Sequence, residues 1–132
     1  MPQATSILVP VSPGELIDKI TILEIKSERI TDADKLHNVR AELDLLLQAR
    51  NAAVPPSDEL AHLTAELKHI NQTLWQVEDV LRDCERRRDF GPTFIQLARS
   101  VYRHNDHRAT LKRRINQRLG CSLLEEKSYA PY

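Results

Sequence analysis

Hydrophobic residues recur along most of this sequence at steps of three and four, which is the spacing of one face of an α-helix. The longest series comprises Leu60, Leu63, Leu67, Ile70, Leu74, Val77, Leu81 and Cys84. Because this alternation lasts for more than three heptads, it predicts a packed helix over 58–88, about 45 Å long, with Ser57 as its N-cap. Leu67 and Leu74 are therefore expected in the core.

Three further helices are predicted, over 13–29, 33–50 and 93–119. The first opens with Ser12-Pro13-Gly14-Glu15, a capping box in which proline occupies the first helical position. The second ends before two consecutive prolines, which cannot continue a helix, and the fourth ends at Gly120.

These elements predict an all-α protein of antiparallel helical hairpins, similar to a four-helix bundle and with one long coiled-coil helix. We expect a single domain over 1–132, with an extended arm at 7–11 and an irregular tail at 120–132. The tail is expected to lie over the bundle, held by its apolar residues Leu123, Leu124, Tyr129 and Tyr132.

The helix predicted over 13–29 has apolar residues on two faces. One face carries a stripe from Leu16 to Leu23, and the opposite side carries Ile22 and Ile25. Since both faces must be buried, the second requires another helix or another subunit. Trp75 also lies off the seam of its helix. We therefore predict self-association, most simply as a homodimer, with Ile22, Ile25 and Trp75 at the interface.

Composition agrees with a helical, soluble chain. Of 132 residues, 41% are apolar and 29% are charged, and the chain contains only three glycines and 5% aromatic residues. No apolar run approaches the ~20 residues of a membrane span, and no basic-then-apolar leader is present. Two cysteines outside any Cys-x-x-Cys pair suit a reducing compartment, so we expect a cytoplasmic protein.

The net charge of zero conceals an uneven distribution. Residues 1–81 carry seven Lys/Arg against thirteen Asp/Glu, whereas residues 82–118 carry eleven against four. The basic part can pack against the acidic part, or it can face an anionic ligand. We do not expect nucleic acid as a partner, because the basic stretch lacks interleaved aromatic residues and the whole chain is not basic.

A polar block in the middle of the helix predicted over 93–119 is the candidate site. Tyr102, Asn105 and Arg108 fall near one face, and Lys112 follows one turn later. These side chains could hold a carboxylate or a phosphate. In the alternative, structural interpretation, Arg108 pairs with an acidic residue of the helix over 13–29, such as Asp18 or Glu24.

The sequence offers few residues for metal binding or for catalysis. The pairs Glu59/His62 and Glu66/His69 resemble half of a di-iron site, but both lie on one helix, and His104 with His107 lacks further ligands. We therefore expect no metal. The sequence contains no nucleophile motif and no glycine-rich phosphate loop, so no cofactor and no catalytic residue are assigned.

Three segments of the chain, 9–29, 97–116 and 125–129, together resemble a family of short bacterial proteins of unknown function. Their most distinctive parts are Ser12-Pro13-Gly14-Glu15, Asn105-Asp106-His107-Arg108 and Glu125-Glu126-Lys127-Ser128-Tyr129. The resemblance implies a lineage, and a loose association with surface-sugar transferases, but no reaction. The helix over 13–29 is also weakly similar to the first helix of the all-helical chorismate mutases, which bind a dicarboxylate.

Two functions are compatible with these features. The first is a self-associating helical interaction or scaffold module, linked through the resemblance to surface-polysaccharide synthesis and able to bind a protein partner. The alternative is a small-anion-binding protein or enzyme with its site at Tyr102, Asn105, Arg108 and Lys112. The sequence favours the first function and a role that is not enzymatic.

Overall fold

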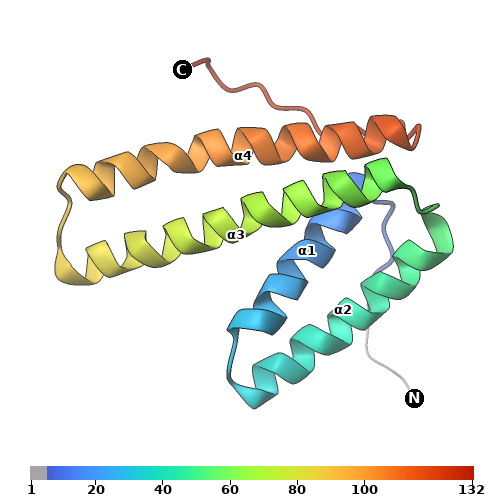
Figure 1. Cartoon of the computed structure of the whole chain (residues 1–132), viewed down its shortest axis with the longest axis horizontal. Coiled ribbons are helices and arrows are strands. Elements are labelled where there is room, and N and C mark those ends of the chain that lie inside the picture. The colour runs from blue at the N-terminus through green and yellow to red at the C-terminus, as the bar shows by residue number, and fades with distance from the viewer. Residues whose placement is uncertain (1–5) are drawn as a thin grey trace.

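The computed structural model describes residues 6–132, which form four helices and no strand (Figure 1). The helices are α1 (Pro13–Arg29), α2 (Ala33–Ala53), α3 (Asp58–Arg87) and α4 (Pro92–Arg118). The all-α prediction is therefore confirmed. Predicted and observed ends differ by one residue or less, except that α2 continues for three residues beyond the predicted end at 50.

Side-chain caps and a left-handed glycine set the ends of the helices. The hydroxyl of Ser12 accepts a hydrogen bond from the Glu15 amide at 3.1 Å, and Ser57 caps α3 through the Leu60 amide at 3.1 Å. Gly120, which follows α4, has a φ of 67°, a conformation that costs glycine little. The capping residues predicted for α1 and α3 are thus confirmed.

The long helices α3 and α4 form a hairpin, and α1 crosses one half of it (Figure 1). α1 packs against all three other helices, whereas α2 packs against α1 alone. α2 consequently contains no buried residue. The core lies where α1 meets the hairpin, and its buried members are Ile17, Leu60, Leu63, Leu67, Ile70, Leu111 and Ile115.

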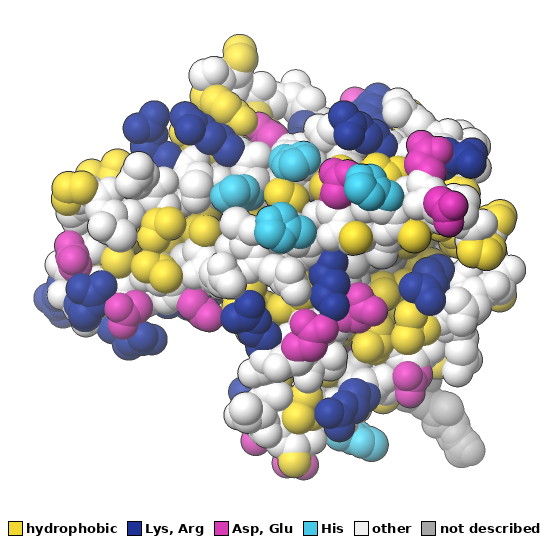
Figure 2. Space-filling view, in the orientation of Figure 1, with side chains coloured by type: hydrophobic (Ala, Val, Ile, Leu, Met, Phe, Trp, Pro, Cys, Tyr) yellow, Lys and Arg dark blue, Asp and Glu magenta, His cyan; other side chains and the backbone are white. Residues whose placement is uncertain are grey.

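The half of the hairpin beyond α1, residues 76–103, is here called the distal arm (Figure 1). Its seam includes Val77 and Cys84, which are 7% and 1% exposed. No helix of the described chain covers this part from a third side, and Val80, Phe90 and Ile95 are exposed there. Figure 2 shows hydrophobic side chains and arginines at this end of the molecule.

The predicted interface residues need correction. Ile25 is 1% exposed within the single chain, and Ile22 and Trp75 are half-buried. Ile25 lies on the same face of α1 as Asp18 and Thr21, and this face packs on α3. The second apolar face of α1 is therefore covered by a helix of the same chain, and Ile25 cannot form a subunit interface.

The two ends of the chain compare differently with the expectations. The predicted arm, residues 7–11, belongs to no helix or strand, and Ile7, Leu8 and Val9 are exposed. In the tail, Leu123 and Tyr129 are 49% and 82% exposed, so they do not hold it by burial. Tyr132 does contact Tyr102, and the other attachments of the tail to α4 are polar.

Among residues 6–132, Leu67 is fully buried, as predicted, whereas Leu74 is only partly buried at the edge of the core. In the same part of the chain, no helix is both long enough and apolar enough to cross a membrane.

A candidate ligand pocket between α4 and the tail

A buried ion pair joins α1 to the middle of α4. The guanidinium of Arg108 donates from Nε to Asp18 Oδ1 at 2.9 Å and from Nη2 to Asp18 Oδ2. Asp18 is 1% exposed, and its pairing with Arg108 raises the pKa of the guanidinium above its ordinary value. This is the pairing that the structural interpretation of Arg108 predicted. Glu24, the other predicted partner, lies 3.8 Å from Lys68 of α3 instead.

Lys112, one turn further along α4, is also buried among carboxylates. Its Nζ lies 2.8 Å from Glu15, 3.9 Å from Asp18 and 3.4 Å from Glu125. Burial alone would lower the pKa of Lys112, but the hydrogen bond to Glu15 and the surrounding negative charges outweigh burial, so the pKa is raised. Lys112 is therefore held in its charged form.

Neutral side chains complete the polar layer between the helices. Asn71 of α3 donates from Nδ2 to Asp18 Oδ1 and to Thr21 Oγ1, both at 2.9 Å. At the start of α1, the Gly14 amide donates to Asn116 Oδ1 at 2.7 Å. A Cβ at position 14 would collide with the Lys112 carbonyl oxygen and lie 2.9 Å from Asn116 Oδ1, so only glycine permits this approach.

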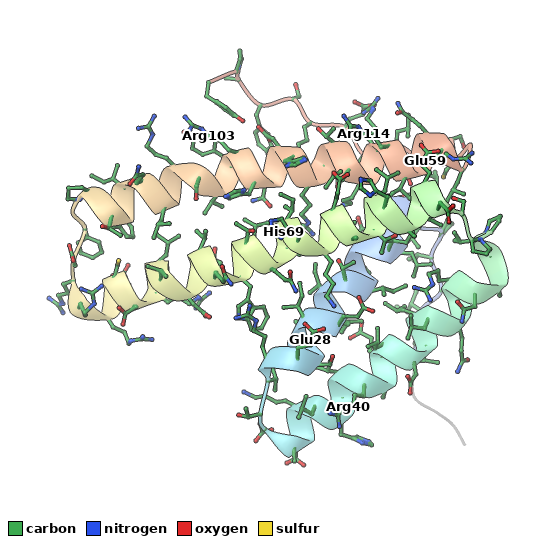
Figure 3. The ribbon with its side chains drawn as sticks, viewed as in Figure 1. Glu28, Arg40, Glu59, His69, Arg103 and Arg114 are labelled. Carbon is green, nitrogen blue, oxygen red and sulfur yellow. The ribbon has the colours of Figure 1, made fainter. Side chains whose placement is uncertain are left out.

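The tail runs back along α4 and contacts it at two places, one near the start of the tail and one at its end (Figure 1). Near its start, Glu125 contacts Lys112, and Glu126 contacts Arg113 at 3.4 Å. At its end, the Tyr132 ring lies 4.8 Å from the Tyr102 ring, and the Arg103 guanidinium lies 5.9 Å from the Tyr132 ring. Figure 3 shows Arg103 projecting from α4 on the side along which the tail runs.

A pocket of about 1170 Å³ lies between α4, the start of α1 and the tail. All four residues of the predicted site, Tyr102, Asn105, Arg108 and Lys112, line it. Glu15 contributes from α1, and the tail contributes Glu125, Lys127, Tyr129 and Tyr132. The sequence-based grouping on α4 therefore coincides with one wall of a real pocket.

The charges of this pocket are nearly balanced. Each of the two cations on α4 that line it already has a carboxylate partner, and Lys127 lies 3.8 Å from Asp106. Of the two alternatives stated for the basic part of the chain, packing against acidic residues is therefore realised at Arg108 and Lys112.

Sequence reasoning missed the acidic half of this site. Glu15 and Glu125 were not assigned to it, and Asp18 was named only as one of two partners for Arg108. One signal was available: Asp18 lies on the face of α1 that also carries Ile22 and Ile25, and a charged residue on a face that must be buried needs a buried partner.

The Glu-x-x-His pairs considered for metal binding lie on α3, whereas His104 and His107 lie on α4 beside the pocket residues Asn105, Asp106 and Arg108. His62 contacts Glu66 of its own helix at 2.9 Å, on an exposed surface. Within residues 6–132, no three side chains of His, Cys, Asp or Glu come together as a metal site requires. Figure 3 shows His69 on α3, away from the tail.

Fold and site together define an all-helical protein with a polar pocket whose floor is a buried network of ion pairs. By its sequence, the chain belongs to a family of unknown function designated DUF6165, whose model matches residues 7–131. Neither the curated proteins nor the solved structures contain a significant match. The three segments that carried the sequence resemblance meet at this pocket, through Glu15, Asn105 with Arg108, and Glu125.

Proposed function

We propose that this protein binds a small polar ligand bearing a carboxylate or phosphate group in the pocket between α4 and the tail. The observation that supports this proposal is the coincidence of a pocket of about 1170 Å³, lined by both polar and apolar residues, with a buried, fully paired charge network on its floor. Asp18 and Lys112 are 1% and 7% exposed.

Stability alone is a poor reason for such a network. Removing two charges from water costs several kcal/mol per ion, and well-packed apolar residues often stabilise a core as well or better (on the order of 1–4 kcal/mol). Buried charges beside an open pocket are, by contrast, typical of binding and catalytic sites, where polar groups must be fixed before the ligand arrives.

The wall of the pocket on α4 offers groups for direct contact. Arg108 keeps 29% of its side chain exposed after pairing with Asp18, so part of the guanidinium faces the pocket. Tyr102 and Asn105 line the same wall, and neither makes a side-chain hydrogen bond within residues 6–132. Asn105 is therefore the residue whose loss should affect the ligand most and the fold least.

The test is a thermal-shift screen of the full-length protein with citrate, malonate, inorganic phosphate, UDP, UDP-glucose and glucose. The nucleotide sugar is included because the resemblance implies an association with surface-sugar transferases. We expect an acidic compound to raise the melting temperature of the wild type but not of Asn105→Ala. Gln96→Ala, an exposed change on the same helix, is the control that should keep the response.

Self-association is a second candidate, and the distal arm favours it. This arm is a two-helix layer with Val80, Phe90 and Ile95 exposed at 41%, 48% and 52%. Pairing with the arm of a second copy would form four helices and cover these residues, which is the common two-fold solution.

Light scattering at a concentration of ~100 µM, where even a weak dimer of micromolar affinity would be populated, tests this candidate. A wild-type dimer that Ile95→Glu converts to a monomer, while Leu45→Glu on α2 does not, supports an interface in the distal arm. A wild-type monomer rejects it. Ile95 does not line the pocket, so either result leaves the proposed ligand site to be judged by its own test.

A further inference from the structure

Two consecutive glutamates of the tail lie on two consecutive cations of α4. Glu125 Oε1 is 3.4 Å from Lys112 Nζ, and Glu126 Oε1 is 3.4 Å from Arg113 Nη2. Arg113 Nη1 also donates to the Glu125 carbonyl oxygen at 3.3 Å. Glu125 and Lys112 line the pocket, and the pair of Glu126 with Arg113 follows directly beside them.

These contacts are weaker than those that α1 makes with the same helix. Charge-assisted hydrogen bonds are typically about 2.7–2.9 Å long, and Glu15 reaches Lys112 at 2.8 Å. The tail carboxylates stand further away, and their side chains are 51% and 74% exposed. Glu15 and Asp18 belong to a packed helix, whereas Glu125 and Glu126 belong to an irregular segment. The tail carboxylates are therefore the replaceable partners.

Little else holds the tail in this position. Every residue from 122 to 132 is exposed, so the tail buries little of its own apolar surface against α4. The tail also makes the long Lys127–Asp106 pair, a hydrogen bond from Asn116 to the Leu123 carbonyl at 3.4 Å, and the contacts of Tyr132 with Tyr102 and Arg103. The Arg113–Glu126 pair is exposed, and such pairs contribute little to stability individually. Lys112 keeps Glu15 and Asp18 when Glu125 is exchanged for a ligand.

We propose that the ligand carries two acidic groups, carboxylate or phosphate, and that they bind where the carboxylates of Glu125 and Glu126 lie. The two tail carboxylates then act as built-in competitors that the ligand displaces from Lys112 and Arg113, while the rest of the tail continues to line the pocket. This inference rests on the proposed function of the pocket. It adds the number of acidic groups, their positions and the side chains that must move.

Competition by the tail predicts that removing its two negative charges raises the affinity of the pocket for the ligand. Neutralising the tail carboxylates in Glu125→Gln/Glu126→Gln should strengthen binding of a diacid, because the binding-competent state no longer competes with the docked tail. Because both tail carboxylates are exposed and lie 3.4 Å from their cations, we expect a gain of roughly threefold to tenfold. If the tail glutamates instead contact the ligand, the same change weakens binding.

The experiment is calorimetric titration of full-length proteins with citrate and malonate as probes that carry two or more acidic groups, and with acetate and inorganic phosphate as probes that carry one. Glu42→Gln/Asp44→Asn is the matched control, since it removes two exposed negative charges from α2, which does not contact α4. We expect the tail variant to bind citrate or malonate more tightly than both the wild type and this control, with no such gain for acetate or inorganic phosphate.

Unchanged or weaker binding by the tail variant overturns the inference. If that result occurs while Asn105→Ala still abolishes a ligand response, the proposed pocket stands and only the competing tail is wrong. If the tail variant and the α2 control gain equally, the effect is one of overall charge and the inference is also overturned. If no compound in either screen binds any of these proteins, the proposed function fails together with this inference.

Discussion

Where α1 crosses it, the α3–α4 hairpin is held by ion pairs between residues remote in sequence, whereas the ion pairs of the distal arm are local. Arg108 and Asp18 are separated by 90 positions, and the Asp18 side chain is 1% exposed. In the distal arm, Arg87 pairs with Asp83 four positions earlier, and both side chains are about half exposed. In the part of the hairpin that α1 crosses, charged residues therefore bind another helix. In the distal arm, the ion pairs join neighbouring residues on an exposed surface.

The energetic consequences differ accordingly. A buried carboxylate that loses its partner is left uncompensated, whereas an exposed pair one helical turn apart contributes at most a few tenths of a kcal/mol. Thus the half of the hairpin crossed by α1 should be sensitive to single charge removals, and the distal arm should tolerate them.

The largest expected effect is that of Arg108→Ala. This change leaves Asp18 buried with only Asn71 and the more distant Lys112, so unfolding should become easier by about 3–5 kcal/mol. Arg87→Ala in the distal arm is the matched control and should leave the urea midpoint nearly unchanged, because its ion pairs are exposed. Urea unfolding of both variants measures the difference. Equal midpoints would show that the two kinds of ion pair are energetically alike.

A second pair of variants compares the apolar seam in the two regions. Leu67 is fully buried beneath α1, so Leu67→Ala should destabilise the fold by about 2–5 kcal/mol. Leu81, on the same seam in the distal arm, is only half-buried, and Leu81→Ala should cost distinctly less. Chemical denaturation decides between them. A larger loss for Leu81→Ala would place the main core in the arm.

The approach of α1 to α4 can be tested at a glycine. Gly14→Ala places a methyl group against the Lys112 carbonyl, so we expect a loss of about 1–3 kcal/mol from overpacking. At Gly91 in the distal arm, a Cβ would meet only the flexible Asp89 side chain at 3.3 Å, so Gly91→Ala should change stability little. Thermal unfolding of the two variants, compared with the wild type, reports this contrast.

The smallest effect is a dependence on pH. The pKa of Lys112 is raised above its ordinary value of 10.5, so its contribution to stability is complete below the unfolded pKa and is lost as pH rises through the folded pKa. The stability difference between wild type and Lys112→Met should be constant from about pH 6 to pH 9 and shrink above about pH 10.5. A difference that already declines between about pH 6 and pH 8 would assign the effect to another group.

In the distal arm, the pH dependence of stability has the opposite direction, because the contribution of Asp83 is lost at low pH. Hydrogen bonds from Arg87 and Arg86 lower the pKa of Asp83 below 3.8, so its contribution is lost only as pH falls through the lowered value.

How much the sequence could predict follows the same division between local and remote interactions. The helix ends were predictable because Ser12, Ser57 and Gly120 act on their immediate neighbours. The four residues of the pocket wall on α4 were predictable because helical spacing places them together. Both kinds of inference use only residues a few positions apart.

The rest of the site depends on how helices cross, which spacing does not encode. The burial of Ile25 within the chain followed from the packing of its face of α1 on α3, so the interface predicted from two apolar faces was wrong at that residue. The attachment of the tail by Glu125 rather than by Tyr129 could not be predicted either, because it depends on where Lys112 lies after folding.

The most direct test of the proposed ligand pocket is native mass spectrometry of gently purified full-length protein, before and after addition of the acidic compound that gives the largest thermal shift. We predict one bound small molecule per chain for the wild type and for Gln96→Ala, and none for Asn105→Ala under the same conditions. A wild-type chain that stays free of ligand, or an Asn105→Ala chain that carries the same ligand equally, would contradict the account.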